Sequence, residues 1–349
     1  MAIKQFVFGI FLLAVGVACS PLRQIEIETF NPSAVSFPAH TKRVLIANNA
    51  VAQPNGNGIT LLGSSQKAQK TDTMSVDSAL FDACKALGEA LVMTNRFADV
   101  RLLHHALRSD NNFSEDKKLT QTQVQNLCKE HQVDAIITLD KLLFEQKRHR
   151  NRFVDGQVLG IVEMKINGLF RVYLPEREQA LALVPMKDSI CWEEFANTED
   201  ILAHYLPSPT KAFREAARYA SARTYHCFAP HWSREYRWYY IGVGAKWKEA
   251  SSYVNVENWE KAAERWEEIY KKTSSSREKA RAASNLALAK ELSGDFKTAY
   301  SWLYKSYELF RKEVSEKNKE TYMTKLYINT LSERIRNDRK LNKQLTPNN

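Results

Sequence analysis

The stretch RAASNLALAKELSGDFKTAYSWLYKSYELF, residues 281–310, decides the fold of the C-terminal part of this chain. Its apolar and small residues recur at helical spacing on both sides of the pair Gly294-Asp295. Asn285 and Leu286 fall on the first helical segment, and Phe296 opens the second. Because a Gly-Asp pair between two periodic segments is typical of a turn, the stretch predicts two antiparallel helices with small residues where they cross.

A second copy of the pattern precedes the first. Three positions of ENWEKAAERWEEIYKK recur 37 residues later: Trp259, Ala262 and Trp266 correspond to Phe296, Ala299 and Leu303. The polar run 273–276 stands where a short insertion between repeats would lie. The repeated pattern resembles the tetratricopeptide repeat (TPR), whose period is about 34 residues.

The TPR resemblance implies a protein-binding groove on the inner helices. It assigns Asn285, Leu286, Lys290, Tyr253 and Trp259 to that groove. Asn285 and neighbouring polar residues would bond to the extended backbone of a partner. The same offset makes Tyr253 and Lys290 corresponding positions of the two repeats, and this difference predicts weaker inner packing in one of them.

The N-terminus, MAIKQFVFGIFLLAVGVACS, reads as an export signal. Lys4 precedes thirteen uncharged residues, 6–18, and Cys19 follows. This pattern predicts a secretory signal peptide over 1–18. Because the run is shorter than the roughly 20 residues that a helix needs to cross a bilayer, a permanent transmembrane anchor is the poorer interpretation.

Cys19 ends the motif Gly16-Val17-Ala18-Cys19, which resembles a bacterial lipobox with Gly16 where Leu is preferred. The resemblance implies that Cys19 is lipidated and that the lipid holds the mature chain on a membrane. Since Ser20 rather than Asp follows, it implies the outer membrane, with the chain facing the periplasm. The alternative is an ordinary signal peptide with an incidental cysteine.

Composition agrees with an exported, folded protein. The chain has 349 residues, 44% apolar and 26% charged, with a net charge of +10. That charge suits anionic envelope surfaces, although plain solubility explains it as well. The basic segment 147–152 has the same two explanations, a solvated loop or a contact with an anionic surface. Because the predicted export takes the chain away from nucleic acid, we expect no nucleic-acid partner.

The middle of the chain predicts an α/β domain over residues 41–230, preceded by a lipidated tether over 19–40. Apolar strands alternate at first with an amphipathic helix, and long hairpins follow from about residue 151. The apolar stripe of that helix consists of Leu80, Cys84, Leu87 and Leu91. This order resembles the N-terminal domain of TolB and small domains of bacterial envelope lipoproteins. With the TPR-like domain, 231–342, and a polar tail, 343–349, the whole resembles a family of uncharacterised envelope lipoproteins. The predicted class is α+β, a mixed-sheet domain followed by an all-α TPR-like domain.

Signatures of catalysis are missing from the sequence, so we expect no enzyme, cofactor or metal site. Glu193 and Glu194 are adjacent on a strand and point to opposite faces, which rules them out as a glycosidase pair. His226, Cys227 and His231 are close in sequence, but a proline breaks the segment between them and no fourth zinc ligand is evident.

Aromatic residues crowd the segment 225–247, with Trp232, Trp238, Tyr240 and Trp247 among them. They predict either an interdomain core, which we favour, or a platform for a glycan or peptide ligand. The function that results is a lipid-anchored scaffold for protein interaction or assembly in the cell envelope. The alternatives are a carbohydrate-binding or hydrolytic protein that uses this aromatic segment, and a purely structural tether.

Overall fold

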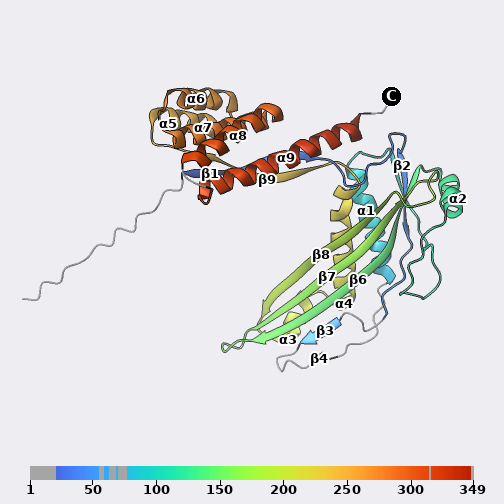
Figure 1. Cartoon of the computed structure of the whole chain (residues 1–349). Coiled ribbons are helices and arrows are strands. Elements are labelled where there is room, and N and C mark those ends of the chain that lie inside the picture. The colour runs from blue at the N-terminus through green and yellow to red at the C-terminus, as the bar shows by residue number, and fades with distance from the viewer. Residues whose placement is uncertain (1–20, 55–58, 63–67, 70–76, 314–315, 347–349) are drawn as a thin grey trace, which may run out of the picture. The chain divides into compact units, whose positions relative to one another are not determined.

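The computed structural model describes residues 21–54, 59–62, 68–69, 77–313 and 316–346 (Figure 1). These residues form two compact units. The sheet unit contains 30–232 and the chain from 338 onward, and the helical unit contains 233–337 and the described residues up to 29. The predicted α+β class is confirmed. The predicted signal peptide, residues 1–18, and the predicted lipidation site, Cys19, lie outside the described residues.

The sheet unit is built around a short parallel core. Its central strand β2 (Arg43–Asn48) is an apolar run that is buried along most of its length, as expected for a strand covered on both faces. Four further strands complete this part: β5 (Asp99–Leu102) and β6 (Ala135–Arg152) run parallel to β2, β3 (Ile59–Leu62) runs parallel to β6, and β4 (Ala68–Gln69) runs antiparallel to β3.

Beyond the core the sheet becomes antiparallel. Long strands β7 (Val158–Tyr173) and β8 (Ala182–Ala196) extend it from β6, which is irregular between Leu139 and Lys141. Along β7, Val162 and Met164 are buried while the residues between and after them are exposed. This alternation is that of a sheet with one covered and one solvated face.

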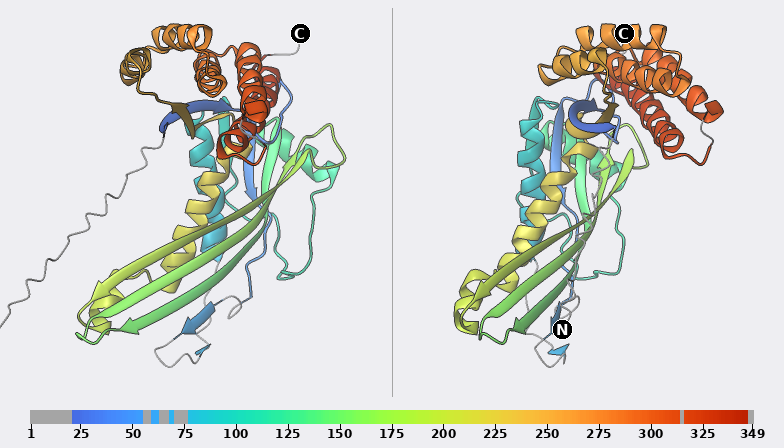
Figure 2. Two further views of the ribbon diagram at one scale, coloured as in Figure 1. Left: turned by 60° about the vertical axis from the view of Figure 1, so that its left-hand side comes forward. Right: turned by 90° about the vertical axis from the view of Figure 1, so that its left-hand side faces the viewer.

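Two helices cover the buried face of the sheet. Helices α1 (Asp77–Met93) and α4 (Pro209–Arg223) lie side by side there (Figure 2), joined by the ion pair of Asp82 with Arg214. The stripe predicted for α1 is confirmed, since all four of its residues are buried: Leu80, Cys84, Leu87 and Leu91.

The other helices of the sheet unit are shorter. Helix α2 (Gln121–His131) packs its Val124 and Cys128 into a separate apolar cluster with β2 residues, and a capping box at Thr120 fixes its start. Helix α3 (Glu199–Tyr205) contacts β7 and β8 near their ends, and the 3₁₀ helix η1 (Thr224–Cys227) follows α4.

The helical unit contains the predicted repeats. Its helices are α5 (Ala245–Asn255), α6 (Trp259–Lys272), α7 (Ser276–Leu292), α8 (Phe296–Glu313) and the start of α9 (Lys319–Leu345). Gly294 has φ of +79°, the left-handed conformation that the turn between α7 and α8 requires and that glycine adopts most readily. Neither this unit nor the rest of the described chain contains a helix long and apolar enough to cross a membrane.

Two predicted boundaries need correction. The segment predicted as a tether contains β1 (Leu22–Asn31), which pairs with β9 (His231–Tyr240), so the helical unit is not all-α. Burial of Ile27 stabilises β1 in place. The predicted tail is wrong in part, because α9 continues to Leu345 and the Gln344 side chain bonds the backbone of Ser33 within the sheet unit.

Candidate functional site

A groove on the helical unit brings together three of the residues predicted to bind a partner. It lies between α6, α7 and α8, with a volume of about 660 Å³. Trp259, Leu286 and Lys290 all line it. Leu286 is buried at the floor, while Trp259 and Lys290 are half-buried at the sides. Three residues that the TPR resemblance assigned to a groove, from two helices, therefore line one surface.

Two tryptophans form the walls of this groove, and each packs against another aromatic ring. Trp259 packs against the fully buried Trp266, with ring centroids 6.5 Å apart. Trp302 on α8 meets Tyr270 edge to face at 5.1 Å. Lys305 holds its Nζ 4.3 Å from the centroid of the Trp302 ring, so that ring already attracts an ammonium group. Braced rings lose little freedom when a ligand binds.

An acidic row forms the rim on α6. Glu260, Glu264 and Glu267 all line the groove, and their spacing of four and three residues keeps them on one side of the helix. Glu267 forms an exposed ion pair with Lys271 at 2.8 Å, and such a pair is weak enough for a ligand to replace. Lys290 contributes a positive charge from α7. The floor and walls of the groove are therefore apolar and aromatic, and its rim is mostly acidic.

Asn285 does not belong to this groove, which corrects the prediction. Its side-chain Oδ1 accepts a hydrogen bond from the Tyr240 backbone N–H at 2.7 Å, and its Nδ2 donates to the Tyr240 carbonyl at 2.7 Å. The side chain is fully buried. Asn285 thus binds the backbone of β9 in its own chain and not that of a partner.

Tyr253 also lies outside the groove. It is half-buried on α5, against the apolar cluster that contains Trp247, and Lys261 has its Nζ 5.7 Å from the ring centroid. Of the two corresponding positions, Lys290 lines the groove and Tyr253 does not, so their difference does not disturb the packing of the groove.

The predicted aromatic platform is mainly core. Tyr240 and Trp247 are buried within the helical unit, and the Trp247 Nε1 donates to Glu278 at 2.7 Å. Trp238 packs against Tyr327 of α9, with centroids 5.5 Å apart. Their own unit therefore covers Tyr240 fully and most of Trp247, which also lines a hollow of about 440 Å³.

Trp232 is the exception among the four aromatic residues. It belongs to the sheet unit, is 64% exposed and lies 5.0 Å from Phe30 by ring centroids. Tyr240 and Trp247 lie in an apolar core of the helical unit itself, whereas the sequence predicted a core between domains.

A buried charge network fixes β9 on the helical unit, and sequence reasoning missed it. Arg237 of β9 donates to both carboxylate oxygens of Glu291 on α7, with its Nη2 2.8 Å from Oε1. Arg334 and the Tyr327 hydroxyl also donate to Glu291. Burial by itself would raise the pKa of Glu291, but the hydrogen bonds and charge of Arg237 outweigh it and lower the pKa. This network holds the strand that Asn285 also bonds.

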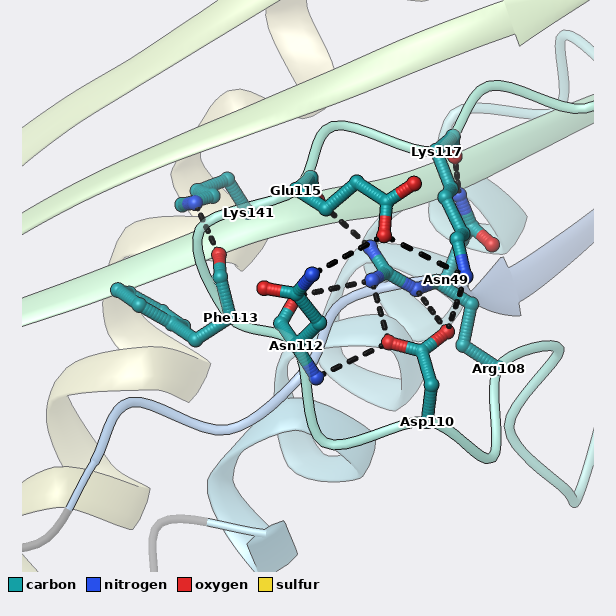
Figure 3. A network of polar contacts seen from close by, with 8 residues as sticks. All are labelled: Asn49, Arg108, Asp110, Asn112, Phe113, Glu115, Lys117 and Lys141. Carbon is teal, nitrogen blue, oxygen red and sulfur yellow. Dashed lines mark hydrogen bonds and ion pairs between the residues drawn. The ribbon is translucent and has the colours of Figure 1, made fainter.

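A second hollow, of about 670 Å³, lies in the sheet unit where β2 and β5 end. Parallel sheets often bind ligands at such carboxyl ends. Here, however, the charges stabilise the loop itself (Figure 3): Arg108 places its Nη2 2.7 Å from an Asp110 oxygen and its Nη1 2.9 Å from the Glu115 carbonyl. Arg108 and Lys117 together lower the pKa of Asp110. The hollow therefore offers little free charge to a ligand.

The chain belongs to the family described as a domain of unknown function (DUF8603), which matches residues 41–240. Residues 248–333 match a second domain of unknown function (DUF6340). No curated protein matches the chain.

One solved structure, described as the crystal structure of an uncharacterized protein, is similar at 13% identity. The similarity covers 54% of this chain and 100% of the other, with a TM-score of 0.22. None of these comparisons names an activity or a ligand.

Proposed function

We propose that this chain is a lipid-anchored cell-envelope protein that binds another envelope protein through the groove of its helical unit. The observation that carries the proposal is the convergence of Trp259, Leu286 and Lys290 on one preformed surface. All three belong to the five residues that the TPR resemblance assigns to a binding groove.

The shape and chemistry of the groove support a protein ligand. Tryptophan is enriched at the energetic centres of protein interfaces, because it buries a large area and loses little rotational freedom. Trp259 and Trp302 are half-buried and flank an apolar floor that includes Leu286. A polar rim around an apolar centre is the usual anatomy of such an interface.

The lipid anchor supplies location. A diacylglyceryl group on Cys19 would hold the chain on a membrane, since each buried methylene contributes about 0.8 kcal/mol. Anchoring also raises the local concentration of the chain relative to a partner on the same membrane. A groove of modest affinity is then sufficient for stable engagement.

Photo-cross-linking in cells tests the binding site directly. A photoreactive residue replaces Lys290 in the groove, and in a matched strain it replaces Lys325, an exposed residue of α9 outside the groove. We expect a discrete adduct from position 290 that is absent from position 325 and is lost when Trp302→Ala removes one wall. Equal adducts from both positions, or none from position 290, would contradict the proposal.

The anchor is tested separately. Wild-type chain should incorporate labelled palmitate and accumulate as a precursor when globomycin blocks the lipoprotein signal peptidase. Cys19→Ala should lose both properties. Processing that ignores both the drug and the substitution would show an ordinary signal peptide and leave the groove proposal standing.

A further inference from the structure

We infer that the groove binds a cationic amphipathic segment of its partner, in which lysine or arginine side chains flank aliphatic ones. This inference rests on the proposed function and specifies the partner's chemistry. It is carried by the sign of the charge at the rim, the nature of the floor and the state of the Trp302 ring.

The charge of the rim is opposite to that of the whole chain. The protein carries a net charge of +10, yet Glu260, Glu264 and Glu267 line the groove against the one ammonium of Lys290. Glu264 pairs with Arg265 at 3.5 Å and Glu267 with Lys271 at 2.8 Å, but the two glutamate side chains are 58% and 46% exposed, and such exposed pairs are weak enough for a partner to compete. Clustered like charges on a surface of the opposite sign steer a complementary ligand and select against an anionic one.

The spacing of the acidic row suits a helix. With a rise of about 1.5 Å per residue, Glu260 lies about 6 Å along α6 from Glu264, and Glu267 lies about 4.5 Å further. Basic residues at the same helical spacing on a partner would meet all three carboxylates. The apolar side of that partner would then face Leu286 and Ala289 on the floor.

The Trp302 ring gives a third indication. Lys305 already places its ammonium over this ring within the chain. A cation over an indole face is attracted by the ring quadrupole, and tryptophan is the best of the aromatic residues for this contact. Lys305 already covers one face of this ring, so a partner lysine in the groove would be held chiefly by the three carboxylates of the rim.

The test is binding of synthetic peptides to the full-length chain in nanodiscs of zwitterionic lipid, followed by fluorescence anisotropy with empty nanodiscs as the blank. The first peptide is an amphipathic helix of leucine and lysine, and the second replaces every lysine with glutamate. We expect saturable binding of the first alone, weakened by salt. The triple variant Glu260→Gln, Glu264→Gln, Glu267→Gln should bind it about tenfold more weakly.

A matched triple variant controls for net charge. Glu28, Glu313 and Glu333 are exposed residues of the helical unit that do not line the groove, and their change to glutamine alters the total charge equally. Binding within about twofold of wild type in this control supports the inference. Equal weakening in both triple variants, or equal binding of the two peptides, overturns it.

The two proposals fail in different ways. If position 290 still cross-links a partner while the cationic peptide does not bind, the assigned chemistry is wrong and the protein-binding function stands. If neither occurs, the function itself is wrong. Binding that Trp302→Ala leaves unchanged would place the peptide elsewhere and would also overturn the inference.

Discussion

Replacing Asn285 with alanine should destabilise the helical unit strongly, because this side chain holds the backbone of β9. Both polar atoms of the amide are bonded to Tyr240, each at 2.7 Å, and the residue is fully buried. Alanine removes both partners at once. The N–H and carbonyl of Tyr240 then stay buried without a hydrogen bond.

The expected cost follows from those two groups. A buried donor or acceptor without a partner costs about 1–3 kcal/mol, so two cost about 2–6 kcal/mol. Alanine is the better helix former and returns about 0.5 kcal/mol on α7. We therefore expect a loss of about 3 kcal/mol in the free energy of unfolding of the helical unit.

Two measurements check this value. Guanidinium unfolding followed by tryptophan fluorescence gives the loss of stability, and hydrogen exchange of a peptide that spans Tyr240 should become about 100-fold faster. Asn329→Ala, at an exposed position on α9, is the control and should change stability by less than about 0.5 kcal/mol. A loss below about 1 kcal/mol with unchanged exchange would refute the assigned role of Asn285.

Three further predictions concern charge, thiol reactivity and the turn. Glu291→Ala removes the buried carboxylate that Arg237, Arg334 and Tyr327 share and leaves Arg237 only its ion pair with Glu235, so it should cost about 3 kcal/mol by denaturant unfolding. Because the folded pKa of Glu291 is lowered, its contribution to the free energy of unfolding is complete above the unfolded pKa of about 4.3 and is lost as the pH falls through the folded pKa. The free energy of unfolding of the variant should therefore fall less steeply at acid pH than that of the wild type. An equally steep fall would contradict this role of Glu291. Burial raises the pKa of Cys84 to about 12, so maleimide should label the exposed Cys191 first and Cys84 only after unfolding; native labelling of Cys84 would contradict its burial. Gly294→Ala should cost about 1 kcal/mol by the same unfolding assay, because φ is +79° while a Cβ there meets nothing within 4 Å; no loss would mean that the turn relaxes.

Local periodicity predicted the helices of the repeats and part of their surface. Trp259 and Leu286 lie on different helices, yet their positions within the repeated pattern follow from helical spacing alone. Such contacts are set by neighbours in sequence, so they can be read from one chain. The same helical spacing correctly predicted which stripe of α1 is buried.

Helical and strand spacing does not predict contacts between residues that are distant in sequence. β1 pairs with a strand that begins more than 200 residues later, and its own pattern of Ile25 and Ile27 between acids does not specify a partner. The Arg237 to Glu291 contact spans 54 residues and joins a strand to a helix. Nothing local distinguishes Glu291 from the exposed glutamates of α6, so its burial required the structure.

The same distant contacts explain how so short an array of repeats holds together. Stacked repeats normally need about three or more units, because each buries only part of its apolar surface alone. In this chain β9 covers α7 in place of a further repeat: Tyr240 reaches Phe310 of α8 at 5.9 Å by ring centroids, and Trp238 contacts α9. The asparagine that the resemblance assigned to a partner instead completes the core of its own unit. Binding is then left to the surface between α6, α7 and α8, where Trp259 and Lys290 remain partly exposed.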